Sequence, residues 1–224
     1  MSEINISYLV TCKNEGEQLN QLLNLLSLYK ENNECIILED DIEDINTLNA
    51  IKQAIEKDHI FFQRYNHPLD NNYGEHKNYG KSKCKGKYIF QIDADELPNE
   101  FLLAALPEIL EANADVDLFW IPRVNDFTGV NEKIASEWGW RLTPYENRLI
   151  VNWPDIQSRI FKNVPYLKWE RKLHEKVEGA KTYSYLPTQY EFSLHHKKTI
   201  EKQVQTNIRY NKQFSITDNK GYKL

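Results

Sequence analysis

The sequence predicts an α/β protein with a mostly parallel central sheet. Two observations lead to this prediction: short apolar runs alternate with amphipathic stretches in the first half, and an acidic cluster directly follows the fourth apolar run. The runs expected to form buried strands are residues 4–10, 35–38, 59–65 and 87–92. Because ligands of such sheets bind outside the carboxyl ends of the strands, we expect residues 11–14, 39–41 and 93–96 to converge on one crevice.

Amphipathic helices are expected between these strands. The first follows Asn14, a candidate N-cap with Glu17 three residues later. Its apolar stripe, at helical spacing, is Leu19, Leu22, Leu23 and Leu26. The stripe of the second helix is Leu48, Ile51 and Ile55. A third helix is expected to follow the polar segment 71–74 and to end near Lys83.

The second half has a different pattern. Residues 101–110 are apolar at helical spacing but contain Pro107, so a kink or two short helices are expected. Beyond Leu118, short β-like runs rich in aromatic residues follow, and residues 199–213 repeat apolar residues at a helical step of four, which predicts a closing helix with a frayed tail after Phe214. Without a repeat or linker, the 224 residues are expected to form a single domain with halves 1–96 and 97–224.

Composition narrows the class of protein. A hydrophobic content of 41% can form a core without disulfides, and no apolar run approaches the roughly 20 residues of a membrane span. The start of the chain lacks a basic region typical of secretory signals, and Cys12, Cys35 and Cys84 have no metal-ligand spacing, so we expect a cytoplasmic protein with ordinary thiols. Net charge is -5, yet residues 161–224 hold 13 basic and 6 acidic side chains, a candidate anion-binding region or a solvated face.

Asp93 and Asp95 are the candidate metal ligands. They stand at i and i+2 directly after the fourth expected strand, where both carboxylates could reach one cation. Mg²⁺ and Mn²⁺ favour oxygen ligands and are often shared between carboxylates and substrate phosphates. The spacing also occurs by chance in acidic turns, but its position after a buried strand favours a site for a diphosphate-bearing ligand.

Four segments in order resemble family 2 glycosyltransferases of the GT-A fold, a Rossmann-like fold that binds nucleotide-diphospho-sugars. The matching segments are residues 7–15, residues 37–41 with Asp44, residues 76–80 followed by 84–87, and the Asp-Ala-Asp-Glu motif at 93–96. The chain departs from the usual family sequence at three positions. Asp41 and Ile42 stand where small residues are common, and Glu39 stands where aspartate is commoner. The resemblance implies a nucleotide-sugar donor, with UDP as the first choice of nucleotide.

The resemblance also implies roles for individual residues. Asp95 would bind Mn²⁺ or Mg²⁺ together with Asp93, which would also lie near the ribose. Contacts to the donor are implied for Thr11, Lys13, Glu15, Asp40, Lys77 and Asp93.

The base that accepts the proton of the attacking hydroxyl is expected to be Glu175. Inverting transfer needs such a group, the family resembles this chain in the pair His174-Glu175, and Asp155 is the reserve candidate. Trp153, Asp155, Gln157, Arg159 and His174 are implied as substrate contacts or supports. Composition alone would instead favour a solvated loop at 174–175 and a core strand at 153–161.

A late histidine often binds the metal in related enzymes, which implies His195. Neighbouring histidines on a strand point to opposite faces, so at most one of His195 and His196 should reach the cation, while Lys197 or Lys198 would neutralise the diphosphate. A pair of surface histidines is the alternative.

Two other classes and the sugar acceptor stay open. A nucleotidyltransferase also uses paired acids, but only Gly16 follows Thr11 where a glycine-rich phosphate loop would be needed. A catalytically inactive module that binds sugar nucleotides is the second alternative. The motif 93–96 and the Pro-Asp-x-Gln-x-Arg pattern resemble short glycosyltransferases of tailed bacteriophages, which implies a host-cytoplasmic location and hydroxymethylated DNA as one candidate sugar acceptor beside glycans and proteins.

Overall fold

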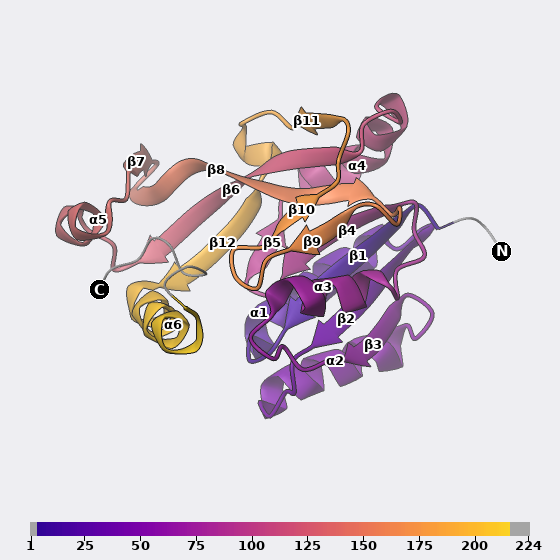
Figure 1. The fold of residues 1–224 in the computed structure, drawn as a ribbon, viewed down its shortest axis with the longest axis horizontal. Helices are drawn as coiled ribbons and strands as arrows, with labels where there is room; N and C mark the ends of the chain where they lie inside the picture. Colours follow the sequence, from indigo (N-terminus) through magenta and orange to yellow (C-terminus); the bar gives the residue numbers. More distant parts are fainter. Residues whose placement is uncertain (1–3, 216–224) are drawn as a thin grey trace.

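A ten-stranded sheet forms the centre of the molecule in the computed structural model, which describes residues 4–215 (Figure 1). Strand order along the sheet is β3-β2-β1-β4-β8-β6-β12-β5, with β11 beside β6 and β7 beside β8. The first four strands run parallel to one another and are β1 (Ile6–Cys12), β2 (Asn33–Glu39), β3 (Phe62–Asn66) and β4 (Tyr88–Asp93). The predicted α/β architecture is therefore confirmed, with the third strand three residues later than expected.

The second half extends this sheet with mixed strand directions. Its strands are β5 (Glu96–Pro98), β6 (Leu118–Thr128), β7 (Leu142–Tyr145), β8 (Arg148–Lys162), β11 (Tyr183–Tyr185) and β12 (Leu194–Thr199). Strand β8 runs antiparallel to both β4 and β6, and so joins the two halves. Strand β12 pairs with β6 and with β5, and this register sets His196 opposite both Asn125 and Glu96. A separate two-stranded sheet consists of β9 (Lys168–Glu170) and β10 (Lys176–Glu178).

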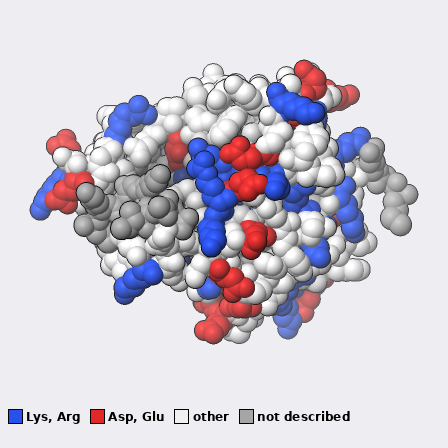
Figure 2. All heavy atoms as spheres, viewed as in Figure 1, with Lys and Arg blue, Asp and Glu red and all other residues white. Residues whose placement is uncertain are grey.

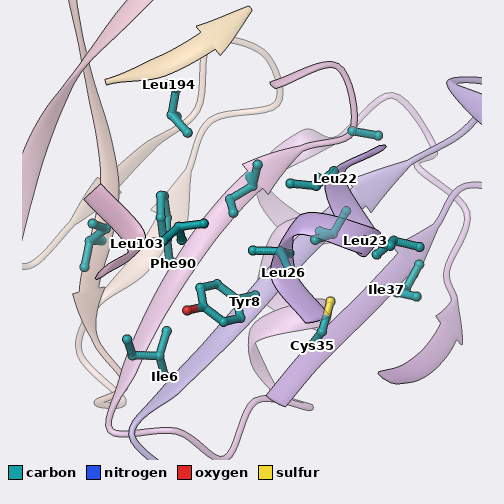
Figure 3. Close-up of a cluster of buried hydrophobic side chains, with 14 of the residues drawn as sticks. Ile6, Tyr8, Leu22, Leu23, Leu26, Cys35, Ile37, Phe90, Leu103 and Leu194 are labelled. Atoms are coloured by element: carbon teal, nitrogen blue, oxygen red, sulfur yellow. The ribbon is translucent and has the colours of Figure 1, made fainter. Parts of the chain in front are cut away.

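Helices α1 (Gly16–Leu26) and α2 (Ile45–Lys57) cover one face of the parallel strands. Figure 3 shows α1 leucines pointing toward Tyr8 and Phe90 of the sheet. The opposite face of β1 and β2 belongs to a second core cluster, which is covered by α3 (Tyr73–Lys81) and the β9-β10 pair. Two 3₁₀ turns occupy Ser27–Tyr29 and Tyr190–Phe192.

The expected N-cap of α1 is wrong, and the alternative of two short helices around Pro107 is wrong as well. Asn14 is not the N-cap of α1, because Glu15 precedes the helix and its carboxylate accepts the backbone N–H groups of Lys13 and Asn14. Helix α4 (Glu100–Ala112) runs through Pro107 as one helix. Proline removes a single backbone donor there, and the helix keeps a buried leucine stripe of Leu102, Leu103, Leu106 and Leu110 that packs on the core.

Two further helices complete the second half, α5 (Glu132–Trp138) and α6 (Ile200–Gln213). The closing helix is confirmed, but only part of its expected stripe is buried: Ile200 is covered, whereas Ile208 is 39% exposed. The tail expected after Phe214 lies, from residue 216 on, outside the described residues. None of the helices within 4–215 combines the length and apolarity required to cross a bilayer.

Gly16 permits the close contact between α1 and α2. A Cβ atom at this position would lie 2.6 Å from Cβ of Asn46 and 2.9 Å from the backbone of α2. We therefore expect Gly16→Ala to lower the free energy of unfolding by about 1–3 kcal/mol, although alanine is the better helix former. Urea denaturation would measure the change. Gln21→Ala, at an exposed position of the same helix, should stay within about 0.5 kcal/mol of wild type, and equal stability of the two variants would contradict the close-packing argument.

Candidate active site

A cavity of about 970 Å³ opens at the carboxyl ends of β1 and β4. Residues 11–15, Asp40 and residues 93–95 line it together, so the three strand ends converge as expected, although Glu39, Asp41 and Glu96 are not part of the wall. Segments 155–159, 173–176 and 196–198 and the inner side of α6 complete the wall. In Figure 2, acidic and basic side chains gather side by side near the middle of the visible face. The cavity is therefore polar, charged and large enough for a nucleotide-sized ligand.

Asp93 is held by side chains from four elements. Its Oδ1 accepts hydrogen bonds from Thr11 (2.7 Å) and Gln91 (2.8 Å), and its Oδ2 lies 2.8 Å from a guanidinium nitrogen of Arg159. Burial would raise the pKa of this carboxyl, but Arg159 and Lys77 hold its pKa well below the ordinary value of 3.8. The protein thus occupies both oxygens of an ionised Asp93, which leaves little capacity for a metal ion.

Lys77 links Asp93 to Glu175. Its side chain is 5% exposed, and its ammonium lies 2.6 Å from Oε1 of Glu175, 3.4 Å from Oδ1 of Asp93 and 3.2 Å from Gln91. Burial opposes the charge, yet the two carboxylates raise the pKa of Lys77. Lys77 was expected to face the nucleotide. Although it lines the cavity, its charge is directed at these two acids.

Arg159 and Arg123 line the cavity and form ion pairs with its acidic residues. One nitrogen of Arg159 contacts Asp93 and Glu96, at 2.8 and 2.6 Å, and another binds the amide oxygen of Gln91. Arg123 contacts Glu96 at 2.8 Å and Asp155 at 2.6 Å. Asp155 also accepts hydrogen bonds from Asn125 and Gln157. Both oxygens of Asp155 are thus bound by neighbours, which weakens its case as the reserve base.

Glu175 stands on the loop between β9 and β10. Two residues of this loop, Arg171 and His174, have positive φ angles of 82° and 53°. The loop rests on the first turn of α3, where the backbone of Tyr73 donates to the carbonyl of Lys172, and a Cβ at Gly74 would lie 2.5 Å from the carbonyl oxygen of Arg171. Glu175 is 15% exposed and His174 lies beside it in the cavity wall. This carboxylate is therefore both fixed and open to a ligand.

The histidine next to the acidic motif is His196. Its Nε2 lies 3.3 Å from Oδ2 of Asp95 and its Nδ1 lies 2.9 Å from Oδ1 of Asn125. His195, the expected metal ligand, points to the other side of β12, packs on the ring of Tyr190 and is absent from the cavity wall. Side chains alternate between the two sides of a strand, so His196 faces the acidic motif and the expected ligand His195 faces away from it. Burial raises the pKa of Asp95, but the contact with His196 lowers the net value below 3.8.

The other end of the cavity is formed by Asp40. Its carboxylate lies 2.6 Å from the ammonium of Lys13 and accepts the backbone N–H of Leu69 at 3.0 Å. His76 lies nearby and is buried, and burial lowers its pKa to about 4, so its ring is neutral at pH 7. Glu15, Asp93 and Asp95 all line the cavity. Burial raises the pKa of Glu15, and the charges of Asp95 and Asp93 raise it further.

Asp95 and His196 are the side chains of this cavity that could contribute to a cation site. Within residues 4–215, no three acidic, histidine or cysteine side chains are grouped closely enough to hold a metal ion by themselves. Asp95 and His196 provide one oxygen-donor and one nitrogen-donor side chain, and Mg²⁺ or Mn²⁺ commonly completes its ligands from substrate phosphates and water. The pair could therefore hold a cation jointly with a phosphorylated ligand.

Twelve of the fourteen residues predicted for the site line the cavity, and Trp153 and His195 do not. Sequence analysis missed Gln91, which is 1% exposed and bonds to Lys77, Asp93 and Arg159. A polar residue in the middle of an otherwise apolar strand was the signal that could have found it. His196 and the inner side of α6 had no comparable signal, because their placement depends on how β12 pairs with β5 and β6.

Comparison with known proteins gives a family match and a set of similar folds. The model of glycosyl transferase family 2 matches residues 7–184. No curated protein matches the chain. The crystal structure of S. aureus TarS 1-349 with UDP-GlcNAc superposes with a TM-score of 0.60 at 14% identity, covering 87% of this chain and 58% of that chain. Another structure of TarS 1-349 gives a TM-score of 0.58 at 15% identity, covering 86% and 60%.

A third structure, the mannosyltransferase PcManGT from Pyrobaculum calidifontis with GDP-Man and Mn²⁺, gives a TM-score of 0.46 at 15% identity and covers 70% of this chain and 44% of that chain. The chain thus spans about 60% of the length of the TarS 1-349 structures. At these identities the likeness to TarS shows the fold, which is the predicted GT-A fold.

The ion pairs of Asp93 predict how stability depends on pH. A carboxylate whose pKa is lowered in the folded state stabilises the protein above its unfolded pKa, and this contribution is lost as the pH falls below about 5. We expect wild-type protein to lose unfolding free energy between about pH 5 and pH 3, and Asp93→Asn to lose less over the same interval. Urea denaturation at the two pH values measures both slopes, and equal slopes would contradict the assignment.

Proposed function

The chain belongs to glycosyl transferase family 2, and we propose that it moves a sugar from a nucleoside-diphosphate donor to a hydroxyl group, with Glu175 as the base. One observation carries this proposal: Glu175, Asp95 and Asp40 all face the same cavity. A base, a cation site and a nucleoside contact are the three groups that such a transfer requires. A catalytically inactive module is disfavoured, because all three positions hold acids.

The donor is proposed to lie along the carboxyl ends of β1 and β4. Asp40, with Lys13 and the backbone near Leu69, would contact the base or ribose, and Glu15, Thr11 and Asp93 would line the path to the diphosphate. A similar fold was solved with UDP-GlcNAc, which supports a UDP-sugar as the first donor to test. The alternative of a nucleotidyltransferase lacks support, since no glycine-rich phosphate loop follows β1.

Asp95 and His196 are proposed to hold Mn²⁺ or Mg²⁺ when the donor is bound. The cation would stabilise the negative charge of the departing nucleoside diphosphate. Lys198 also faces this end of the cavity: burial lowers its pKa, and Asp95 and Glu15 act in the opposite direction. Lys198 is therefore the nearest candidate for a cationic side chain at the diphosphate.

The proposed transfer is a single displacement with inversion. The oxygen of the sugar acceptor forms a bond to the anomeric carbon while the bond from that carbon to the diphosphate breaks, and Glu175 accepts the proton of the attacking hydroxyl. Lys77 restrains the carboxylate of Glu175 at the 2.6 Å contact. Asp155 is unsuited to this role because Arg123, Asn125 and Gln157 bind it.

Glu175→Gln should remove the proton acceptor with almost no change of shape. We expect transfer to fall by about 10²–10⁴ in kcat, while UDP binding measured by calorimetry stays unchanged. Glu178→Gln, an exposed position on β10, is the matched control and should transfer sugar normally. Undiminished transfer by Glu175→Gln would rule out its role as the base.

His196→Ala should weaken the cation site, whereas His195→Ala should not. We expect at least about a tenfold loss of Mn²⁺ affinity in the presence of UDP for His196→Ala, because the imidazole that contacts Asp95 is lost. His195 faces away from the cavity, so its alanine variant serves as the control. Titration of Mn²⁺ followed by electron paramagnetic resonance gives both affinities, and an equal loss in the two variants would refute the placement.

The sugar acceptor can be identified together with the donor. Incubation with a panel of nucleotide sugars and Mn²⁺, with glycans, proteins and hydroxymethylated DNA as candidate acceptors, should release a nucleoside diphosphate and label one class, as detected by mass spectrometry. Hydroxymethylated DNA is included because of the basic excess in residues 161–224. Release from no nucleotide sugar would overturn the proposed function.

A further inference from the structure

Helix α6 turns its polar side toward the cavity. Lys202, Thr206, Arg209 and Tyr210 all line the cavity wall, at the spacing of one helix face, while Ile208 on another side of α6 is 39% exposed. An ordinary surface helix buries its apolar stripe and exposes its charges. Helix α6 follows this rule in part, because Ile200 and Val204 pack on a core cluster and Lys202 and Arg209 are exposed, but these two charges face the cavity, where a polar ligand could contact them.

Among the described residues, the charges on this face have no acidic partner. Four acids of the cavity wall, Asp40, Asp93, Asp155 and Glu175, are each paired with a lysine or arginine. Across residues 4–215, by contrast, no ion pair joins Lys202 or Arg209 to an aspartate or glutamate; the guanidinium of Arg209 lies over the ring of Tyr210. This side of the cavity therefore has a local excess of positive charge.

The donor alone does not account for these two cations. Lys198, four residues before Lys202, is the basic side chain beside Asp95 and so the one placed for the diphosphate. Arg209 is about 10 Å farther along the helix axis than Lys202. Its guanidinium lies over the ring of Tyr210, whose centroid is 6.1 Å from that of the Tyr73 ring. The backbone of Tyr73 in turn donates to the loop that carries Glu175. Arg209 thus reaches the end of the cavity where Glu175 would meet the sugar acceptor.

Helix α6 also lies outside the part of the chain shared with the family. The family match ends at residue 184, and α6 covers Ile200–Gln213. The family match therefore assigns no role to the residues of this helix.

We propose that the inward face of α6, through Lys202 and Arg209, binds a phosphate group of the sugar acceptor. This inference rests on the proposed transferase function and adds the chemical class of its second substrate. It assigns to α6 a phosphodiester-bearing chain, because two cations about two helical turns apart suit a ligand with repeated negative charges better than a single anion.

The test uses a labelled short oligothymidylate with phosphodiester linkages and its uncharged methylphosphonate counterpart. Binding is followed by fluorescence anisotropy at several salt concentrations, with saturating UDP and Mn²⁺ present to fill the donor end. We expect only the phosphodiester chain to bind. For Lys202→Gln/Arg209→Gln we expect at least about tenfold weaker binding and a salt slope shallower by about 1.4, the value for two lost single-strand phosphate contacts.

The matched control is Lys57→Gln/Lys133→Gln, which removes two exposed charges from α2 and α5, neither of which lines the cavity. This control should keep the wild-type slope. An unchanged slope in the α6 variant, equal binding of the methylphosphonate chain, or loss of binding when UDP is added would each overturn the proposal. Donor turnover measured in parallel separates the two claims: turnover with an unchanged slope rejects only the phosphate site, and a reduced slope without turnover rejects only the transferase function.

Discussion

The ion pair between Arg159 and Asp93 is the contact on which the site depends. Arg159 comes from β8, the strand that joins the two halves of the sheet, and Asp93 ends β4 of the parallel half. Both belong to a network with Lys77, Gln91, Glu96 and Glu175 that is largely closed to solvent. Buried charges are tolerated only when each has partners in good geometry. The network therefore fixes the acidic turn and the loop with Glu175 relative to each other.

Because of this network, Asp93 and Asp95 have different roles although they are only two residues apart. Asp93 is surrounded by donors and ionised, and it anchors the turn. Within residues 4–215, the carboxylate of Asp95 has hydrogen bonds or ion pairs with His196 alone. It therefore keeps capacity for a ligand. Chemically identical residues thus acquire different roles from their neighbours, as in other sites where environment separates paired acids.

Local patterns in the sequence were sufficient to predict the parallel half. The leucine stripe of α1 and the polar residues that follow β1, β2 and β4 depend on neighbours close in sequence, and they fall where expected. The placement of His196 depends instead on the register of β12 with β5, a contact between residues about a hundred positions apart. Pro107 does not divide α4 into two helices for a related reason: packing of the leucines of α4 outweighs a local preference against helix.

The parallel half and helix α6 therefore differ in how well they tolerate amino-acid substitutions. Substitutions in the parallel half disturb short crossover units and the buried network at once, because Thr11, Lys77 and Asp93 belong to both. Helix α6 has two exposed cations on its cavity side, and replacing them breaks no buried ion pair within the described chain. A change of sugar acceptor should then require substitutions chiefly on α6, while the geometry that holds Glu175 and Asp95 is retained. The physical reason is that an unpaired surface charge can be exchanged at little cost in stability, whereas a member of a closed network cannot.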